Sequence, residues 1–492
     1  MKESIPTNRI QAALSSASLL VEIRGTIPDQ VASIEDDSRR VGPGSLFIAV
    51  KGSERDGHDY LEKARSAGAA MAVVEDAGRA NLPAFVVRDG RKAAAIVAGA
   101  AFDWPARRLQ LTGVTGTNGK TTTVHILRHL LDAPKRRSAS IGTVGVLVGS
   151  EGRPLDGDSG LTTPGPAELQ RLLRTLVDAG VRQVAMEVSS HALHQGRVGG
   201  IGFEAVVFTN LSRDHLDYHG TMEEYRDAKT RLIDCLAPHG TVVVNLDDQA
   251  WRALSTERRR VSYSARVPTA EVNAQHVEFT PRGSRWTLVM AGERSAVQLP
   301  LIGDFNVSNA LAASAAAYAL GMPVATIATR LATVPQVPGR LEAVHENPTV
   351  LRDYAHTPDA LERALQAVRP FTRGRLIVVF GAGGDRDRGK RPQMGAIAER
   401  LADHAIVTSD NPRTESPEAI LDEIEAGMQG GGANHDRIED RREAISRALA
   451  MAHNDDVVLL AGKGHETYQI RGTEKLPFDE KTIVAELTRT RA

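Results

Sequence analysis

The sequence predicts an α/β protein of three domains, and three observations lead to this prediction. The chain of 492 residues is too long for one hydrophobic core, and the usual domain size of about 100–200 residues suggests about three domains. Short apolar runs alternate with helical segments, which is typical of parallel sheets covered by helices. The composition changes near Arg108 and near Pro338. We therefore expect domains at residues 1–108, 109–337 and 338–492.

The first domain is expected to be a small α/β unit. The runs Ser45–Val50 and Ala72–Glu75 predict short strands, and Tyr60–Gly68 predicts a helix that ends at its glycine. These elements precede the turn-rich, charged stretch Asp103–Arg108, which marks the expected boundary.

The central domain is expected to contain a parallel, doubly wound sheet, because apolar runs recur with helical segments between them. These runs are Leu109–Val114, Val181–Val188, Ala205–Leu211 and Thr241–Leu246. The stretch Val272–Leu301 then alternates as strands do, and Val307–Leu320 predicts an alanine-rich helix that Gly321 ends.

The third domain resumes the alternation and is expected to be Rossmann-like. Its predicted strands are Leu376–Phe380, His404–Thr408 and Val457–Ala461, and each runs directly into a polar or glycine-rich turn. Open α/β sheets bind ligands at the carboxyl ends of their strands. The third domain is therefore expected to bind a ligand.

Charge and composition narrow the function classes. The 60 basic and 61 acidic side chains leave a formal net charge of -1, so no global field attracts nucleic acid or a membrane. No apolar stretch approaches the ~20 residues of a membrane span, and the start lacks a signal-peptide pattern. The one cysteine, Cys235, excludes an internal disulfide framework and is expected to be a small core residue. We expect a cytoplasmic monomer.

A glycine-rich loop joins the first strand of the central domain to the helical segment Val124–Leu131. Its glycines let backbone N–H groups approach phosphate oxygens, while Lys120 adds charge and Thr121 offers a hydroxyl to Mg²⁺. The strict phosphate-loop pattern has glycine where Val114 stands, but strand, loop and helix follow in the required order. A P-loop ATPase-like domain is predicted. Its expected ATP contacts are Gly116, Thr117, Asn118, Gly119, Lys120, Thr121 and Thr122.

Two other patterns match known sites only in part. His215 and His219 have the spacing of zinc ligands, but Leu216 stands where a zinc hydrolase needs glutamate. The run Gly381–Gly384 resembles a dinucleotide fingerprint, but Arg386 occupies the place of its last glycine. Neither a zinc hydrolase nor an NAD enzyme is predicted.

The run Gly113–Thr122 is similar to the phosphate loop of the Mur ligase superfamily, whose variant lacks the same first glycine. Six further motifs resemble this family in order along nearly the whole chain. They are Asp37-Ser-Arg39, Met186-Glu-Val-Ser-Ser-His191, Asn210-Leu-Ser-Arg-Asp-His-Leu-Asp217, Asp353-Tyr-Ala-His-Thr-Pro358, Asp410-Asn-Pro-Arg413 and Gly462-Lys-Gly-His-Glu466. Each motif is weak alone, but six in order across three domains are highly specific.

The resemblance implies an ATP-dependent ligase that joins an amine to a carboxylate in peptidoglycan precursor synthesis. ATP would convert the carboxylate of UDP-N-acetylmuramoyl-L-alanyl-D-glutamate to an acyl phosphate, and meso-diaminopimelate would displace the phosphate. Two Mg²⁺ ions and Lys120 would neutralise charge on the transferring phosphoryl group.

The resemblance also implies the metal site. Thr121, Glu187 and His215 are implied as Mg²⁺ ligands, and Lys229 as a carbamylated lysine whose anionic oxygens bind metal. Lys120, Glu187, His215 and Lys229 are thereby the implied catalytic residues. The residues alone leave open a surface carboxylate at Glu187, a satisfied loop histidine at His215 and a solvated Lys229 on a predicted helix Met222–Cys235.

Contacts to the rest of the nucleotides follow from the same resemblance. Adenine and ribose contacts are implied at Asn306, Arg340, Asp353 and His356, although Asn306 could be only a helix cap. Contacts to the UDP-sugar dipeptide are implied at Ser38, Thr162, Thr163, Ser189, Gln195 and Arg197. Asp36 and Ser53-Glu54-Arg55 stand where the family carries other residues, so the uridine contacts there stay open.

The acceptor amino acid would bind in the third domain. The implied contacts are Arg386, Asp410, Asn411, Pro412, Arg413, Gly462 and Glu466. A planar guanidinium takes a carboxylate in two parallel hydrogen bonds, and meso-diaminopimelate has a distal carboxylate that lysine lacks. Arg413 is therefore expected to select the acceptor, unless it is a structural arginine paired with Glu415.

Three alternatives remain at this stage. The first is a ligase of the same family that adds L-lysine. The second is a folylpolyglutamate synthase, which leaves the Asp37–Arg39 region unexplained. The third is a P-loop kinase or binding protein that forms no amide.

Overall fold

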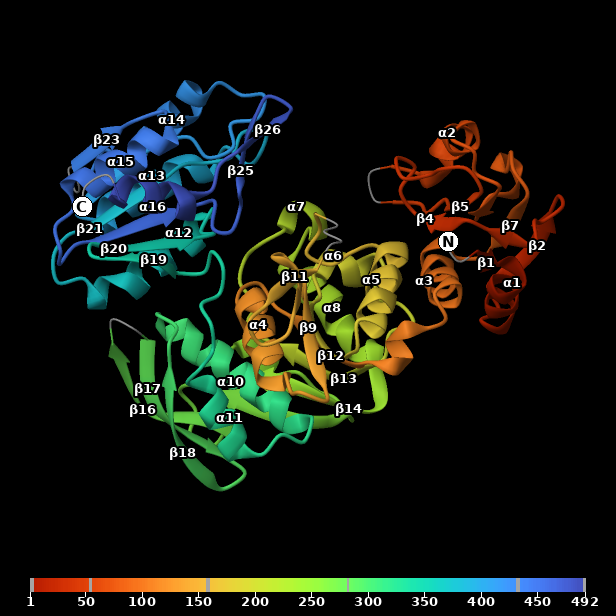
Figure 1. The fold of residues 1–492 in the computed structure, drawn as a ribbon, viewed down its shortest axis with the longest axis horizontal. Helices are drawn as coiled ribbons and strands as arrows, with labels where there is room; N and C mark the ends of the chain where they lie inside the picture. Colours follow the sequence, from red (N-terminus) through yellow and green to blue (C-terminus); the bar gives the residue numbers. More distant parts are fainter. Residues whose placement is uncertain (1–3, 53–54, 156–159, 281–282, 431–433, 490–492) are drawn as a thin grey trace. The chain divides into compact units, whose positions relative to one another are not determined.

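The computed structural model describes residues 4–52, 55–155, 160–280, 283–430 and 434–489. Ser53 and Glu54, whose uridine contacts were left open, lie outside the described residues. The α/β class is as predicted, with a large sheet in each of three regions of the chain (Figure 1). The chain falls into two compact units, and the segment Ala296–Val307 groups with the C-terminal region. Among the described residues, no helix is long and apolar enough to cross a membrane.

The N-terminal region contains a five-stranded sheet in the order β2-β7-β6-β5-β4, in which only the edge strand β2 runs antiparallel. Its strands are β2 (Leu20–Arg24), β4 (Ser33–Glu35), β5 (Ser45–Ile48), β6 (Met71–Val74) and β7 (Ala84–Val87), with β1 (Ile5–Pro6) and β3 (Gln30–Val31) paired apart from it. Its helices are α1 (Thr7–Ser16), α2 (Leu61–Ser66) and α3 (Gly90–Ala101). The predicted strands and helix are confirmed within a few residues.

The central region contains an 11-stranded sheet in the order β11-β10-β9-β12-β8-β13-β14-β15-β16-β17-β18. The strands are β8 (Gln110–Thr115), β9 (Arg137–Gly142), β10 (Gly145–Val148), β11 (Arg153–Leu155), β12 (Val181–Glu187), β13 (Phe203–Phe208), β14 (Leu236–Asn245), β15 (Arg259–Ser264), β16 (Val272–Thr280), β17 (Gly283–Met290) and β18 (Glu293–Leu299). Neighbouring strands from β9 to β16 are parallel, as predicted. Antiparallel β10 and β11 make the sheet mixed, which the sequence did not indicate.

The helices of this region are α4 (Lys120–Leu131), α5 (Pro166–Asp178), α6 (Ser190–His194), α7 (Leu216–His219), α8 (Met222–Thr230), α9 (Gln249–Arg252), α10 (Asp304–Ala319) and α11 (Val324–Leu331). The predicted helix Met222–Cys235 is too long. Its α-helical part ends at Thr230, and Arg231–Cys235 form a tighter 3₁₀ turn that leads directly into β14. Cys235 is partly buried beside the central core, and burial raises the pKa of its thiol to about 11.

The C-terminal region contains a six-stranded sheet in the order β19-β20-β24-β21-β22-β23, parallel except for the edge strand β19. Its strands are β19 (Glu342–Glu346), β20 (Thr349–Asp353), β21 (Leu376–Phe380), β22 (His404–Val407), β23 (Asn434–Arg437) and β24 (Val457–Ala461), followed by the hairpin β25 (Tyr468–Arg471) and β26 (Glu474–Pro477). Its helices are α12 (Pro358–Val368), α13 (Lys390–Leu401), α14 (Pro417–Glu425), α15 (Arg441–Met451) and α16 (Glu480–Arg489).

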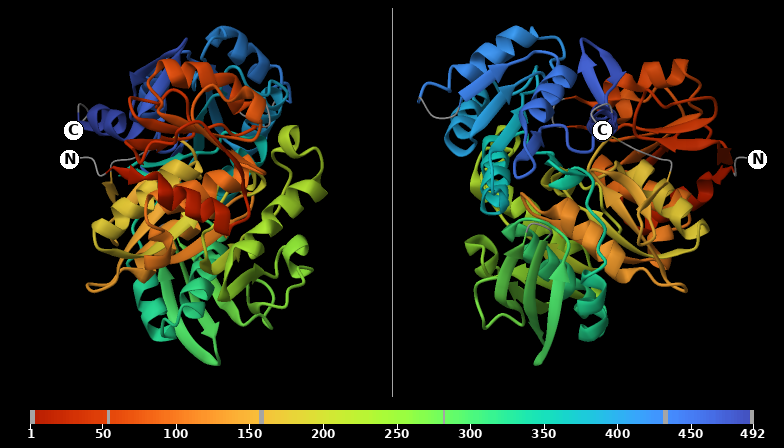
Figure 2. Two further views of the ribbon diagram at one scale, coloured as in Figure 1. Left: turned by 90° about the vertical axis from the view of Figure 1, so that its right-hand side faces the viewer. Right: turned by 60° about the vertical axis from the view of Figure 1, so that its left-hand side comes forward.

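Helices cover both faces of this C-terminal sheet (Figures 1 and 2). On one face, Leu376, Val378 and Phe380 of β21 share a core with residues of α12, α13 and α14. The alternate residues Ile377 and Val379 share a second core with α15 and α16. This alternation is the one expected of a strand buried on both sides, and it agrees with the Rossmann-like prediction for this region.

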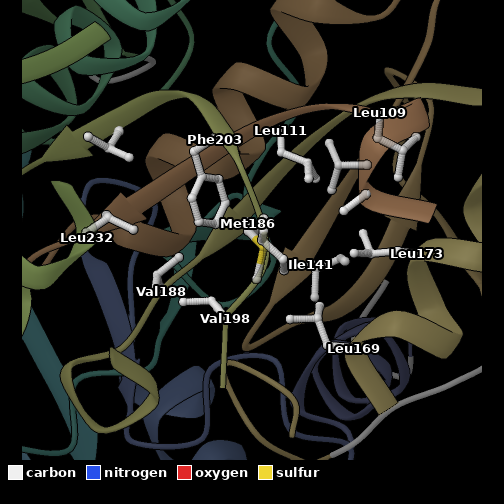
Figure 3. Packing of buried hydrophobic residues seen from close by; sticks show 14 of the residues in the cluster. Leu109, Leu111, Ile141, Leu169, Leu173, Met186, Val188, Val198, Phe203 and Leu232 are labelled. Atoms are coloured by element: carbon white, nitrogen blue, oxygen red, sulfur yellow. The ribbon is translucent and has the colours of Figure 1, made fainter. Parts of the chain in front are cut away.

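The central core shows how α5 is attached to its sheet. Leu169 and Leu173 of α5 pack against Ile141, Met186 and other strand residues (Figure 3). These side chains are almost completely buried, and burial of each Leu contributes roughly 1.5–3 kcal/mol. The same helix begins two residues after the Thr162-Thr163-Pro164 stretch, so the core fixes where that stretch lies.

A test of the C-terminal packing uses Gly395 in α13. A Cβ atom there would lie 2.1 Å from the Ile424 carbonyl oxygen of α14, so Gly395→Ala must push the two helices apart. The steric clash should lower the unfolding free energy by about 1–3 kcal/mol. The better helix propensity of alanine should offset about 1 kcal/mol of this loss at most. Urea unfolding measures this change. The exposed Gln393→Ala on the same helix should change stability by no more than about 0.5 kcal/mol, and an equal effect of the two would contradict the packing argument.

Candidate functional site

The predicted glycine loop connects β8 to α4 and depends on two glycines. Gly116 has φ of 151° and Gly119 has φ of 83°, within the left-handed half of conformational space. A Cβ on Gly116 would lie 1.9 Å from the Thr209 hydroxyl, and one on Gly119 would lie 2.3 Å from the Asn309 side-chain oxygen. The loop backbone therefore lies directly against its neighbours, and Asn309 is a buried neighbour that the sequence did not single out.

The segment that follows β13 holds the loop in shape. The Thr117 N–H donates to the Asn210 carbonyl at 2.8 Å, and the Asn118 N–H donates to the Asn210 side chain at 2.9 Å. The Thr209 hydroxyl donates to the Asn118 carbonyl at 2.7 Å, and the Thr117 hydroxyl donates to the Ser212 carbonyl at 3.1 Å. These bonds fix the loop before any ligand binds, which favours binding of a rigid polyphosphate.

Positive potential concentrates where α4 begins. The Lys120 ammonium donates to the carbonyls of Gly116 and Thr117 at 2.9 and 2.8 Å, so its charge lies over the loop. No acidic residue belongs to the first turn of α4, where the positive end of the helix dipole lies. Thr121 and Thr122 follow in that buried first turn. This arrangement suits an anion such as a phosphate group.

A buried carboxylate lies beside the loop at the end of β12. Glu187 is 1 % exposed and accepts hydrogen bonds from the Thr121 hydroxyl at 3.1 Å and from the Thr143 N–H at 2.8 Å. A Cβ on Gly142 would lie 2.2 Å from its oxygen, so the glycine makes room for it. The alternative of a surface carboxylate is wrong. Thr143 was missed because it follows a strand that the sequence did not reveal.

Lys229 is also buried, at 1 % exposure, and the alternative of a solvated lysine is wrong. Its amine donates to the Gly116 carbonyl at 2.9 Å and lies 4.3 Å from the centre of the Tyr225 ring. Burial lowers the pKa of this amine well below its usual value, and the positive charge of Lys120 acts in the same direction. The neutral amine, which is the nucleophilic form, is therefore favoured.

His215 precedes α7 in a left-handed conformation with φ of 53°. Its Nε2 lies 3.4 Å from an Asp214 carboxylate oxygen, and its ring contacts the ring of His191 edge-on at 4.8 Å. Burial lowers its pKa, which favours the neutral imidazole that binds metals. The Asp214 contact also fits a satisfied loop histidine, so the ligand role stays a prediction.

In the described part of the chain, no three His, Cys, Asp or Glu side chains gather in a way that could hold a metal ion. Thr121 and Glu187 bring a hydroxyl oxygen and a carboxylate oxygen within 3.1 Å of each other. Mg²⁺ prefers oxygen ligands and is commonly bound by one or two protein side chains together with substrate phosphates. The donor set present therefore fits Mg²⁺ bound with a nucleotide.

Two threonines implied in sugar and peptide contacts lie near Glu187, one at its backbone carbonyl and one beside Thr143. The Thr163 hydroxyl donates to the Glu187 carbonyl at 3.0 Å and accepts from the Ser189 N–H at 3.0 Å. The Thr162 and Thr143 hydroxyls are 3.1 Å apart. Residues 162–163 and 189 therefore border the Glu187 site directly.

Arg197 extends this cluster. It donates to the Thr163 carbonyl at 2.9 Å and to the Gln195 side-chain oxygen at 2.6 Å. The Gln195 amide in turn donates to the Tyr218 hydroxyl at 3.1 Å, which also contacts His194 Nδ1 at 2.9 Å. Tyr218 and His194 were not predicted, because neither belongs to a motif with a stated role.

Ser38 is the one UDP-substrate residue that the hydrogen bonds of the described residues do not connect to this cluster. It lies half-buried after β4, beside Asp37, whose carboxylate pairs with Arg39 at 2.7 Å. The Asp36 carboxylate accepts from the Ala167 N–H of α5 at 3.3 Å. Asp36 therefore has a structural contact in this chain.

The residues implied at the adenine and ribose belong to the C-terminal unit. The Arg340 guanidinium lies 4.9 Å from the Tyr354 ring centre, and the His356 ring lies 4.6 Å from the same ring. The Asp353 carboxylate accepts from the N–H groups of Leu341 and Ala355 at 2.8 Å each. Arg340, Asp353 and His356 are thus gathered around one tyrosine.

Asn306 is not a helix cap, and that alternative is wrong. Helix α10 begins at Asp304, three residues before the expected start at Val307, so Asn306 lies inside the first turn. Its side-chain amide donates to the Ile302 carbonyl at 2.7 Å.

The predicted acceptor loops meet at the carboxyl ends of β21 and β22. The Arg413 guanidinium donates to the Gly384 carbonyl at 2.7 Å. A Cβ on Gly383 would lie 2.9 Å from that guanidinium and 3.8 Å from Arg386 Cγ, so both arginines border this glycine. Gly384 packs equally closely on Pro412, because a Cβ there would lie 1.8 Å from the Pro412 carbonyl oxygen.

The alternative partner of Arg413 is wrong. Glu415 pairs with the completely buried Arg391 at 2.8 Å and accepts from the Asp385 N–H. Arg391 also donates to the Gly383 carbonyl at 3.3 Å. It therefore ties together the two loops that carry Arg386 and Arg413.

A buried polar cluster completes this end of the sheet. The Asn411 amide donates to Glu466 at 2.9 Å, and the fully buried Lys463 donates to the Asn411 side-chain oxygen at 3.0 Å. One carboxylate oxygen of Asp410 is buried without a hydrogen-bond partner, and a Cβ on Gly462 would lie 2.4 Å from it. Such an oxygen is costly unless a ligand donates to it. Lys463 belongs to the Gly462–Glu466 motif, but nothing in that motif indicated its burial.

Comparisons with known proteins cover all three regions. The chain matches the profile described as Mur ligase middle domain over residues 114–317, the Mur ligase, glutamate ligase domain over 339–464, and the Mur ligase family, catalytic domain over 30–103.

Curated relatives match over nearly their full length. A protein of Geobacillus thermodenitrificans is 47% identical over 96% of this chain and 98% of its own length. A protein of Gloeobacter violaceus is 46% identical over 97% of each chain. Both are named UDP-N-acetylmuramoyl-L-alanyl-D-glutamate--2,6-diaminopimelate ligase.

Solved structures agree in fold. One described as a UDP-N-acetylmuramoyl-L-alanyl-D-glutamate--2,6-diaminopimelate ligase superposes with a TM-score of 0.68 at 32% identity, covering 100% of this chain and 99% of the other. The MurF ligase of Thermotoga maritima, solved in complex with ADP, has a TM-score of 0.62 at 19% identity over 94% of this chain and 98% of its own, a likeness of fold alone. The full-length identity to curated relatives and the matches in all three regions show that the chain belongs to the Mur ligase family.

Proposed function

We propose that this protein is an ATP-dependent ligase that forms an amide between UDP-N-acetylmuramoyl-L-alanyl-D-glutamate and meso-diaminopimelate, with release of ADP and phosphate. One observation carries the proposal. Relatives named for this activity are 47% identical along 96% of the chain, so the similarity includes the phosphate loop, the Glu187 cluster and the acceptor loops together.

The phosphate loop would hold ATP. The start of α4 would face the anion, and Lys120 lies within hydrogen-bond distance of the loop carbonyls. A bound γ-phosphate offers stronger acceptors than these carbonyls, so the ammonium would turn to it. The hydroxyl of Thr121 and the carboxylate of Glu187 would then hold Mg²⁺ beside the phosphates, with His215 as a further ligand. The ion would supply charge neutralisation for phosphoryl transfer.

Lys229 would carry a carbamate. A carbamate forms when a neutral amine attacks carbon dioxide and loses a proton, and burial lowers the pKa of the Lys229 amine, which favours that neutral form. The product is an anion with two oxygens, which turns a poor metal ligand into a hard oxygen ligand. It would also replace the repulsion between Lys229 and Lys120 with attraction.

The reaction balances in two steps. In the first step, a carboxylate oxygen of the dipeptide attacks the γ-phosphorus of ATP, and the bond from that phosphorus to the bridging β-phosphate oxygen breaks. ADP departs, and the dipeptide becomes an acyl phosphate. The neutral amine of the acceptor then attacks the acyl carbon, phosphate departs and the nitrogen loses a proton. Thr163, Ser189, Gln195 and Arg197 border Glu187 and would hold the dipeptide so that its carboxylate faces the phosphate loop.

The acceptor site favours a substrate with a second carboxylate. Arg413 and Arg386 border the same glycine, and the nearby Glu415 is already paired with Arg391. The unpartnered oxygen of Asp410 would accept from an ammonium group of the acceptor. L-Lysine has no distal carboxylate, so its binding would leave the positive charge of the Arg413 guanidinium without a partner from the ligand. The site therefore disfavours L-lysine.

Release of ADP with each amine tests the proposal directly. With ATP, Mg²⁺ and the UDP-muramoyl dipeptide, addition of meso-diaminopimelate should start ADP release, and L-lysine should give at most about 1% of that rate. A coupled ADP assay with both amino acids in parallel measures this. ATP hydrolysis that is equally fast without any amino acid would indicate a phosphatase or kinase instead.

Replacement of Lys229 with alanine should reduce kcat at least about 100-fold, because the carbamate oxygens are lost, and added bicarbonate should not restore it. Carbon-13 NMR with labelled bicarbonate should show a carbamate signal in the natural protein and none in the variant. Arg226→Ala, an exposed change on the same helix, is the matched control and should keep both the signal and the rate. A normal rate for Lys229→Ala would remove Lys229 from the mechanism.

Replacement of Arg413 with alanine should lower kcat/KM for meso-diaminopimelate about 100-fold or more, while the KM values for ATP and the dipeptide change little. The reason is the loss of the two-point grip on the distal carboxylate. Steady-state kinetics with each substrate varied in turn measure the effect. Arg400→Ala removes an exposed, Glu362-paired arginine of the same domain and should leave all constants unchanged. Unaltered use of meso-diaminopimelate by Arg413→Ala would show that another residue selects the acceptor.

A further inference from the structure

We propose that Asp36 is a positioning residue for the UDP-linked substrate, because its carboxylate joins the loop that contains Ser38 to the start of helix α5. The identity of the ligand rests on the proposed function. The contact itself rests only on the described residues and links the N-terminal sheet to the central region within one compact unit.

Helix α5 lacks a cap of its own. The residue before it, Gly165, has no side chain, and Pro166 at the first helical position has no N–H. The Ala167 N–H is therefore the first donor at this end that needs an acceptor. The Asp36 carboxylate accepts it at 3.3 Å. A carboxylate at this position also interacts favourably with the helix dipole.

The chain is shaped to admit this carboxylate. A Cβ on Gly165 would lie 2.8 Å from an Asp36 oxygen, so a larger residue before α5 would displace the cap. Ala167 itself is 1% exposed and packs in the hydrophobic core of the N-terminal region, with Ile34 among its members. Helix α5 also contacts α3 of that region (Figure 1). The cap thus forms at a packed junction.

Ion pairs hold the same loop on both sides of Ser38. Before it, Arg171 of α5 donates to the Ile34 carbonyl and to the Glu35 carboxylate, both at 3.1 Å. After it, Arg40 donates to Glu168 of α5 at 2.5 Å. The loop is therefore attached to α5 through residues 34–36 and through Arg40.

These hydrogen bonds and ion pairs set the distance between Ser38 and Thr163, which are both predicted to bind the substrate. Ser38 lies two residues after Asp36, and Thr163 lies two residues before Gly165. Ser38 is implied at the uracil and Thr163 at the sugar and peptide. A ligand that must reach both binds best when their separation is fixed beforehand, because less conformational entropy is lost on binding. The residue at position 36 would then act through Ser38 and Thr163 without touching the ligand.

The test compares Asp36→Ala, Asp36→Asn and the natural protein in full steady-state kinetics. Asp36→Ala should raise the KM for the UDP-muramoyl dipeptide about fivefold to tenfold, with kcat and the KM values for ATP and meso-diaminopimelate unchanged. Asp36→Asn keeps an oxygen acceptor and should recover most of the loss, since Asn is as good a cap as Asp. Asp89→Ala removes the carboxylate cap of α3 in the same region and is the matched control, with an unchanged KM.

Amide hydrogen exchange of the protein alone separates this inference from the proposed function. Asp36→Ala should speed exchange at Ala167 and in residues 160–165, and leave α4 unchanged. If the natural protein fails to use the dipeptide, the proposed function is wrong, and the exchange result still decides whether the cap exists. Overturning results are an unchanged dipeptide KM in an active Asp36→Ala enzyme, an equal rise in Asp89→Ala, or unchanged exchange at Ala167.

Discussion

The buried carboxylate of Glu187 is the group around which the candidate site is organised. A carboxylate taken out of water is costly unless donors surround it, and here the Thr121 hydroxyl and the Thr143 N–H and hydroxyl supply them at 3.1, 2.8 and 3.2 Å. The donors come from the phosphate loop helix and from the turn after β9, and the Glu187 carbonyl accepts from Thr163. One residue at a strand end therefore sets the relative positions of the nucleotide loop and the substrate loop.

Two lysines converge on a second point of the same loop. The amines of Lys120 and Lys229 both donate to the Gly116 carbonyl at 2.9 Å. Two ammonium groups on one acceptor repel each other, and the more deeply buried one is the easier to neutralise. Burial and the neighbouring Lys120 charge therefore both lower the pKa of the Lys229 amine.

The sequence predicted most of the fold, because strands, helices and the glycine loop leave local patterns. It could not predict features that depend on distant residues. The burial of Lys229 depends on how α8 lies against the loop, and a lysine on a polar helix carries no sign of that. The places of Asn309 and Lys463 in the site follow only from their contacts in the fold. Asn309 lies against Gly119, and Lys463 donates to Asn411. Asn306 was misjudged as a possible cap because α10 begins three residues earlier than its apolar pattern suggests.

The acceptor end shows why a partner cannot be assigned by proximity in sequence. Glu415 is two residues from Arg413, yet it pairs with Arg391, which lies on α13 and whose side chain has no solvent exposure. A buried guanidinium needs carboxylates more than a half-exposed one does, so Arg391 takes Glu415 and, at 2.8 Å, Glu423 as well. Arg413 is left bound to the Gly384 carbonyl, a weaker acceptor than a carboxylate. The burial of one arginine therefore leaves the other able to recognise a carboxylate on a ligand.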